Sequence, residues 1–158
     1  MKKISQILFV LTIALFASAC GGSKDKGPDV ATEIVAEWHL VSMSGLSDSA
    51  VPQVYVEFAS DMWFELYQKV GDGRYRKYEG YYTVSGSNVT GQYIDGKKWG
   101  SDYKVSFEDG KLVMTAQNGS AEVCKYEKKA LSASDKANAE VVTKSEEQGF
   151  CYPDDQVC

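Results

Sequence analysis

The chain has 158 residues, of which 22 are acidic, 17 are basic and one is histidine, and its formal net charge is −5. A protein that binds the phosphate backbone of a nucleic acid presents a basic patch or stripe, and this charge balance argues against one. With His39 as the single histidine, a two-histidine metal site is excluded. We therefore expect no nucleic-acid partner, no metal and no cofactor.

The first 19 residues have the organisation of an export signal. Lys2 and Lys3 form a basic start, an apolar run covers residues 7–16, and small residues follow at 17–19. The apolar run is too short for a membrane-spanning helix that is retained. Removal of residues 1–19 takes away two lysines and no acidic residue, so the mature chain carries a net charge of −7.

Cys20 follows this signal in the sequence Ala17-Ser18-Ala19-Cys20, which resembles the lipobox of bacterial lipoproteins. In that family the cysteine thiol receives a diacylglycerol, the signal is cut before it, and the new amino terminus is acylated. More than one acyl chain gives stable anchoring, so the resemblance implies an exported protein held at the outer membrane through Cys20. The alternative is ordinary cleavage after Ala19, and the periplasmic or surface-facing orientation stays open. Residues 20–33 predict the lipidated cysteine and a flexible tether.

Residues 34–129 alternate strand-like runs with turn residues at a nearly constant interval, which is typical of an all-β domain. Short turns such as Asp109-Gly110 and Asn118-Gly119 force each strand to pair antiparallel with the next. Eight strands are predicted, at residues 37–43, 53–58, 62–69, 75–84, 88–94, 102–108, 111–117 and 121–128. Together they predict an eight-stranded antiparallel up-and-down barrel, since closure removes exposed sheet edges.

The alternation of side chains along each strand predicts which residues face the interior. Gly80 and Gly91 interrupt two of the strands and predict sharp bends or close contacts within a closed sheet. The predicted inward residues are Trp38, Leu40, Val54, Val56, Phe58, Phe64, Leu66, Tyr78, Tyr82, Val89, Tyr93, Tyr103, Val105, Phe107, Leu112 and Met114. Charged and polar residues alternate with them, as expected for a barrel with one face in water.

Several segments together resemble the small lipocalin-like domain of bacterial lipoproteins, over residues 34–129. They are Ala36-Glu37-Trp38, where lipocalins usually have Gly-x-Trp, and the runs at 54–58, 64–67, 79–84, 88–93 and 95–103. The resemblance implies a barrel whose closed end is plugged by Trp38 and whose fold has the capacity to hold a small apolar ligand. Ala36 in place of glycine departs from the pattern next to Trp38.

Two functions are compatible with such a barrel, because eight strands enclose either a filled core or one small molecule. The first is binding of a small apolar or amphiphilic ligand, for which the candidate residues are Tyr78, Tyr82, Tyr93, Trp99 and Tyr103. The second is a structural or interaction module of the cell envelope that binds protein or glycan. Eight large aromatic side chains on the predicted inner face leave little empty space, which favours a filled or nearly filled barrel.

The second function would use aromatic residues on the outer face. These are Trp63, Tyr67, Tyr75 and Tyr81, and the alternative is that some of them pack under the C-terminal segment. The sequence has no nucleophile elbow and no phosphate-binding glycine loop, and we expect a protein that is not an enzyme. His39 is expected on a strand, facing water.

Three cysteines remain once Cys20 is assigned to lipid. Cys151 and Cys158 flank a short loop that contains a proline, and they are predicted to form a disulfide. The alternative joins Cys124 to one of them and fixes the tail to the barrel.

Residues 130–158 lie outside the pattern of strands and form a C-terminal tail. Within it, residues 134–142 predict a short helix that is capped by Ser134 or Asp135.

Overall fold

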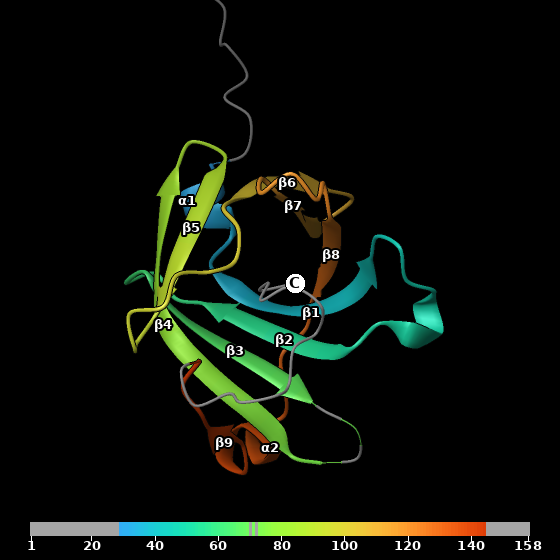
Figure 1. Ribbon diagram of the computed structural model, residues 1–158, viewed down its shortest axis with the longest axis vertical. Helices are drawn as coiled ribbons and strands as arrows, with labels where there is room; N and C mark the ends of the chain where they lie inside the picture. The colour runs from blue at the N-terminus through green and yellow to red at the C-terminus, as the bar shows by residue number, and fades with distance from the viewer. Residues whose placement is uncertain (1–28, 70, 72, 145–158) are drawn as a thin grey trace, which may run out of the picture.

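The computed structural model describes residues 29–69, 71 and 73–144, and the strands in this part of the chain close into a barrel (Figure 1). Its eight barrel strands are β1 (Ala36–Met43), β2 (Gln53–Phe58), β3 (Trp63–Lys69), β4 (Tyr75–Ser85), β5 (Asn88–Tyr93), β6 (Tyr103–Glu108), β7 (Lys111–Ala116) and β8 (Val123–Lys128). Each strand pairs antiparallel with its neighbours in sequence, and β1 pairs with β8. The predicted lipocalin-like, eight-stranded up-and-down barrel is confirmed.

Four shorter elements accompany the barrel. They are α1 (Val30–Glu33), the 3-10 turn η1 (Asp48–Ala50), α2 (Ala133–Ala137) and β9 (Glu140–Val141). Helix α1 lies in the segment that the sequence assigned to the tether. Its Val30 is buried, so the packed part of the protein begins before residue 34.

The predicted C-terminal helix exists, but its start and end differ from the prediction. Ser132 caps α2, because its hydroxyl accepts a hydrogen bond from the Asp135 amide at 3.1 Å, so neither Ser134 nor Asp135 is the cap. The helix ends at Ala137, and residues 140–141 form β9 instead of continuing it. The helix is shorter than predicted because residues 140–141 pair with β4 instead. β9 runs parallel to β4 and pairs with it at Arg76 and Lys77, where β5 does not pair.

Helix α1 and the residues after it cover one end of the barrel. Ile34 and Trp38 are fully buried there, and the Trp38 indole Nε1 donates a hydrogen bond to the Ile34 carbonyl at 2.8 Å. The Trp38 ring also contacts Phe107, with the ring centroids 6.0 Å apart. Trp38 is therefore an inward plug at the α1 end of the barrel, as the lipocalin-like resemblance implies.

The inward face follows the predicted alternation. All of the predicted inward residues belong to one buried cluster except Phe107, which is half-buried and packs against it. Gly80 interrupts this row of inward side chains because there is no room for a side chain there. A Cβ at this position would lie 2.1 Å from the Gln92 carbonyl oxygen on β5. The close contact predicted at Gly80 is thus an approach of backbone to backbone.

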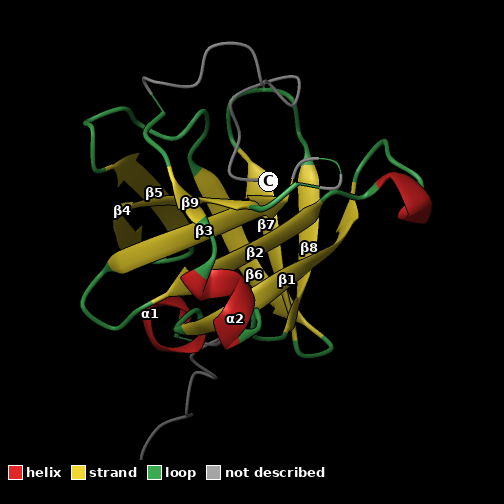
Figure 2. Ribbon diagram, turned by 90° about the horizontal axis from the view of Figure 1, so that it is seen from below, coloured by secondary structure: helices red, strands yellow, loops and turns green. Residues whose placement is uncertain are grey.

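The outer face of the barrel is partly covered by the C-terminal segment. Leu131, just before α2, packs with Tyr55, Tyr67 and Tyr75 in a second buried cluster, and Figure 2 shows α2 in front of β1 and β2. The expectation that some outer aromatic residues pack under this segment is confirmed for Tyr67 and Tyr75. Tyr81, by contrast, is 59% exposed.

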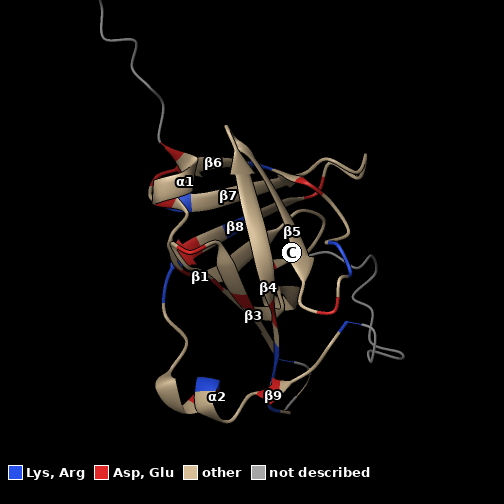
Figure 3. Cartoon of the chain, turned by 90° about the vertical axis from the view of Figure 1, so that its left-hand side faces the viewer, with Lys and Arg blue, Asp and Glu red and all other residues tan. Residues whose placement is uncertain are grey.

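Charged groups hold α2 to β1 and β2, and Figure 3 shows basic residues in blue on α2 and acidic residues in red along the strands. The Lys136 ammonium lies 2.8 Å from the carboxylates of both Glu37 and Glu57. Burial alone would lower the pKa of Lys136, but its hydrogen bonds to the two carboxylates raise it above the ordinary value. Lys136 therefore stays charged, and it connects α2 to β1 and β2.

A second charged group, centred on Glu65, lies on the same face. Lys77 and the Tyr67 hydroxyl both donate hydrogen bonds to the Glu65 carboxylate, the latter at 2.6 Å. Burial alone would raise the pKa of Glu65, but these two hydrogen bonds hold it below its ordinary value of 4.5. Burial and the bond to Glu65 raise the pKa of Tyr67, which keeps its hydroxyl a donor.

This lowered pKa predicts a loss of stability in acid. Because the Glu65 pKa is lower in the folded chain than in the unfolded chain, its contribution is complete above about pH 4.5 and disappears as the pH falls through the folded-state pKa. Denaturant unfolding at about pH 6 and about pH 3 should show a smaller acid-dependent loss of unfolding free energy in Glu65→Gln than in the wild type. Equal losses in the two proteins would contradict the assignment.

Several predicted features lie outside the described residues. These are the export signal, the lipid attachment at Cys20, and the disulfide between Cys151 and Cys158.

Cys124 is described, and it is fully buried on β8 as part of the barrel core. Among the described helices, none has the length and apolar character needed to cross a membrane.

Candidate functional site

The five residues predicted to contact a ligand meet in one aromatic cluster inside the barrel. Trp99 is central: its ring centroid lies 5.0 Å from that of Phe64, 6.0 Å from that of Tyr103 and 6.4 Å from that of Phe58. The remaining candidates join through the two phenylalanines. Tyr82 contacts Phe58, Tyr93 contacts Phe64, and Tyr78 contacts Tyr93, with centroid separations of 5.0, 5.6 and 6.1 Å.

Tyr82 differs from the other tyrosines because its hydroxyl has a fixed backbone partner. It donates a hydrogen bond to the Ala59 carbonyl at 2.7 Å, in the turn between β2 and β3. Burial, with a smaller contribution from Asp61, raises the pKa of Tyr82, so the hydroxyl remains a donor. Tyr82 thus ties the barrel wall to the β2–β3 turn through a backbone carbonyl.

Trp99 reaches the interior from an irregular part of the β5–β6 hairpin. Its amide donates to the Gly91 carbonyl at 3.0 Å, and the Tyr93 amide donates to the Lys97 carbonyl at 2.8 Å, so residues 97–99 run antiparallel beside β5. Beyond these residues the pairing register changes: Gln92 pairs with Lys98, but Val89, three residues earlier, pairs with Tyr103, five residues later. Residues 100–102 therefore form a bulge.

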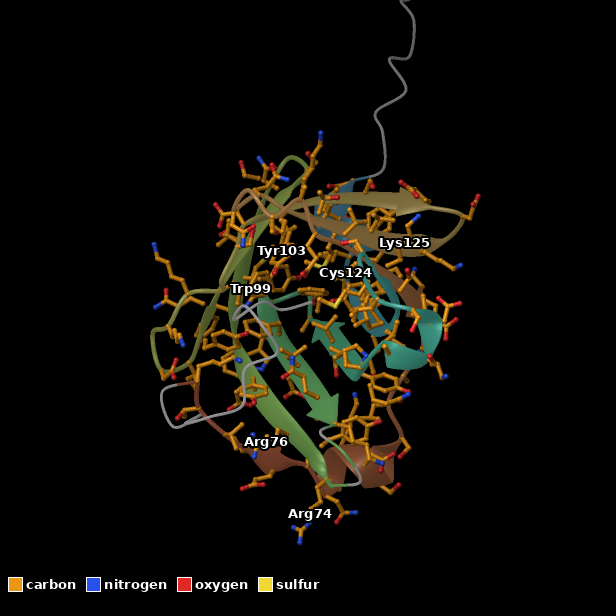
Figure 4. The ribbon with its side chains drawn as sticks, turned by 45° about the vertical axis from the view of Figure 1, so that its right-hand side comes forward. Arg74, Arg76, Trp99, Tyr103, Cys124 and Lys125 are labelled. Atoms are coloured by element: carbon orange, nitrogen blue, oxygen red, sulfur yellow. The ribbon has the colours of Figure 1, made fainter. Side chains whose placement is uncertain are left out.

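Gly91 makes room for the Trp99 side chain. A Cβ at Gly91 would lie 2.1 Å from Cε2 of the indole, which is far closer than non-bonded carbon atoms approach each other. The indole thus fills the inward space that a side chain at Gly91 would take, and only 6% of Trp99 is exposed. In the sequence, Trp99 falls between the strands predicted at 88–94 and 102–108; the structure places its side chain within the barrel wall. Figure 4 shows Trp99 next to Tyr103.

The Trp99 indole N–H is buried without a hydrogen-bond partner among the described residues. Buried tryptophan N–H groups usually find one, and leaving such a group unsatisfied costs about 1 to 3 kcal/mol. The position over Gly91 is therefore good for the apolar part of the indole and poor for its polar atom. β-Bulges often occur beside functional sites, where they redirect a side chain.

A depression with a volume of about 340 Å³ lies on the outer side of Trp99. This volume is at the lower end of the range for small-ligand sites, roughly 300 to 1,000 Å³. Trp99 and Gly91 contribute to both the aromatic cluster and the depression, so this part of the wall separates the two. The lining residues are Tyr81, Thr83, Thr90, Gly91, Gln92, Lys98, Trp99 and Asp102.

Lys144 is a further residue of the interior that no pattern in the sequence predicts. Its ammonium nitrogen lies 4.7 Å from the ring centroid of Tyr78 and 5.6 Å from that of Tyr93. The residue is 8% exposed. An isolated lysine in a polar C-terminal tail has no periodicity or motif that would predict such a position.

The single histidine lies on the outside of the barrel. His39 stacks on Tyr55 with the ring centroids 4.4 Å apart, and its Nδ1 is 3.4 Å from a carboxylate oxygen of Glu127. Only 14% of its side chain is exposed, so it faces outward but is more covered than expected. Within residues 29–144 as described, no three histidine, cysteine, aspartate or glutamate side chains are grouped so as to hold a metal ion.

The sequence matches no protein-family model and no curated protein. The fold itself defines the class: a closed, eight-stranded, lipocalin-like up-and-down barrel, with its aromatic interior against Trp99.

The contact between Trp99 and Gly91 predicts a specific coupling between two substitutions. Gly91→Ala should lower the unfolding free energy by about 1 to 3 kcal/mol, because the new methyl group collides with the indole. In a Trp99→Ala background the same change should cost less than about 1 kcal/mol, since the obstacle is gone. Denaturant unfolding of the four proteins measures this coupling.

Gly80→Ala is the matched control. Its Cβ would meet the backbone of Gln92 and Tyr93 instead of a side chain, so its cost should be the same with and without Trp99. Equal costs of Gly91→Ala in the two backgrounds would show that the indole does not occupy this space.

Proposed function

We propose that the barrel binds a small apolar or amphiphilic molecule, whose apolar part takes the place of the Trp99 indole between Phe58, Phe64 and Tyr103. The observation that carries this proposal is the position of Trp99 itself. It is the one ring of the aromatic cluster that comes from outside the regular strands, and it lies directly between the cluster and a depression open to solvent.

The chemistry of the cluster supports an apolar ligand. Phe58 and Phe64 are at most 1% exposed and offer only hydrocarbon surface around the indole. A hydrocarbon group of similar volume would keep these contacts, and it would not bury an unsatisfied N–H. A ligand that binds better to the state in which Trp99 is displaced shifts the protein toward that state.

Such exchange requires residues 97–102 to move away from β5. On the β5 side, backbone hydrogen bonds hold the segment at Lys97 and Trp99, and the bulge interrupts the ladder beyond them. At the other end, the Gln117 amide donates to the Asp102 carbonyl and to the Ser101 hydroxyl, so the segment would move about residues 101–102. The apparent association constant is then the intrinsic association constant multiplied by the fraction of molecules in which Trp99 is displaced.

A disulfide across this segment tests the proposal. Gln92 and Lys98 are paired residues of an antiparallel bridge, and the spacing of such partners suits a disulfide. In Gln92→Cys/Lys98→Cys the oxidised protein should bind dodecanol at least about tenfold more weakly than the reduced protein, because Trp99 can no longer leave. Calorimetric titration with dodecanol measures the two affinities.

Wild-type protein under the same oxidising and reducing conditions is the control for the natural cysteines, and peptide mapping identifies the new cross-link. Failure of the wild type and of the reduced variant to bind dodecanol would reject the proposal of an apolar ligand. Equal binding by the oxidised and reduced forms would reject the displacement of Trp99.

We also propose that the barrel belongs to a lipoprotein that is exported and anchored to the outer membrane through acyl chains on Cys20. The basic, apolar and small-residue blocks before Cys20 support this proposal. Mass spectrometry of the N-terminal peptide from envelope-extracted protein should find Cys20 at the terminus with diacylglycerol and an amide-linked acyl chain. An unmodified Cys20, or a chain that retains residues 1–19, would contradict the anchor.

A second candidate function is recognition of an envelope glycan or protein by the outer face. Cross-strand pairing aligns Trp63, Tyr81, Gln92 and Lys98 in one row, and the exposed Tyr81 borders the depression. Binding of this kind would be equal in the oxidised and reduced forms of Gln92→Cys/Lys98→Cys, because it does not require Trp99 to move, and it would be lost in Tyr81→Ser. Both proposals are non-enzymatic, in keeping with a single histidine that is stacked against Tyr55.

A further inference from the structure

The C-terminal segment reaches the barrel interior along an edge that β5 leaves unpaired. β5 pairs with β4 only from Gly80 onward, whereas β9 pairs with β4 at Arg76 and Lys77. The Val142 amide then continues this pairing by donating to the Lys77 carbonyl at 3.0 Å. This arrangement brings Lys144 to the point where Tyr78 and Tyr93 face inward.

Lys144 differs from the other lysines that lie over aromatic rings. It is the one lysine that is buried among the described residues. Lys128, for comparison, lies 5.2 Å from the Trp38 ring centroid but is itself exposed. The rings beneath Lys144 are also buried, with 1% of Tyr78 and 3% of Tyr93 exposed.

Two aromatic rings around one ammonium group make a recognisable binding arrangement. The electron-rich faces of tyrosine rings attract cations, and the attraction is stronger where water is excluded. Aromatic cages of this type bind quaternary ammonium groups of ligands. The Tyr78 and Tyr93 rings lie 6.1 Å apart and are inclined by 65°, so they form two walls of such a cage around the Lys144 ammonium.

We propose that Tyr78 and Tyr93 form an ammonium-binding subsite of the barrel, and that Lys144 is its built-in occupant, which a ligand with an ammonium head group displaces. This inference rests on the proposed function, because the apolar part of the ligand would occupy the neighbouring aromatic cluster. Tyr93 joins the two regions, since its ring contacts both Tyr78 and Phe64. The ligand class is thereby narrowed to cationic amphiphiles.

Lys144 belongs to the same chain as the two tyrosines, and this gives it an advantage over a free ligand. A group held on the same chain competes at an effective concentration in the millimolar range. Removal of the Lys144 ammonium should therefore increase the affinity for a cationic amphiphile more than the affinity for a neutral one of the same chain length.

The experiment compares dodecyltrimethylammonium, dodecanol and dodecyl sulfate, below their micelle-forming concentrations, by calorimetric titration into the wild type and Lys144→Met. The variant should bind dodecyltrimethylammonium about tenfold more tightly than the wild type, with dodecanol changed by less than about threefold. Lys128→Met, which removes an ammonium from the Trp38 ring instead, should leave all three affinities unchanged.

A second variant keeps the inference falsifiable if Lys144→Met alters the packing. Adding Tyr93→Leu to Lys144→Met should abolish the gain for the cationic probe, and thermal unfolding reports separately on stability. If dodecanol binds but Lys144→Met gives no gain for the cationic probe, or the same gain for dodecyl sulfate, the ammonium subsite is rejected and the apolar site stands. If none of the three probes binds any variant, both proposals fail.

Discussion

The packing of Trp99 against Gly91 is the contact on which the candidate site depends. It closes the barrel wall where the β5–β6 register changes, and it joins Phe58, Phe64 and Tyr103 into one cluster. A side chain on residue 91 would exclude the indole, and a regular β5–β6 ladder would leave no bulge beside it. The local irregularity and the aromatic interior are therefore parts of one arrangement.

The C-terminal segment imposes the second constraint. Leu131 and Lys136 fix its first part to the outer face, through an apolar cluster and through the carboxylates of Glu37 and Glu57. Its last described residues then follow the free edge of β4 to Lys144. One short segment thus covers outer tyrosines and contributes a cation to inner ones, which links the outside of the barrel to its interior.

The strands could be predicted from the sequence because two signals agree along residues 36–128. Alternation sets the inward face, and Asp-Gly or Asn-Gly turns set the length of each strand, so the pairing order leaves little choice. The same alternation identified the four candidate tyrosines, whereas Trp99 lies between two predicted strands and has no such pattern. Gly91 was correctly expected at a close contact, but nothing local identifies Trp99 as its partner.

What could not be predicted depends on contacts between distant parts of the chain. The register shift at residues 100–102 accompanies the packing of the Trp99 indole into the core, and β9 depends on the edge of β4 that β5 leaves unpaired. Lys144 has no local pattern at all, and its position is set by β9. Each of these features is decided by tertiary packing, which local strand propensity does not report.

A crystal structure of the protein in complex with dodecanol would show directly whether the ligand replaces Trp99. In that complex we expect the Trp99 indole to have left its place over Gly91 and the dodecyl chain to contact Phe58, Phe64 and Tyr103. A bound dodecanol with Trp99 still packed on Gly91 would contradict this expectation.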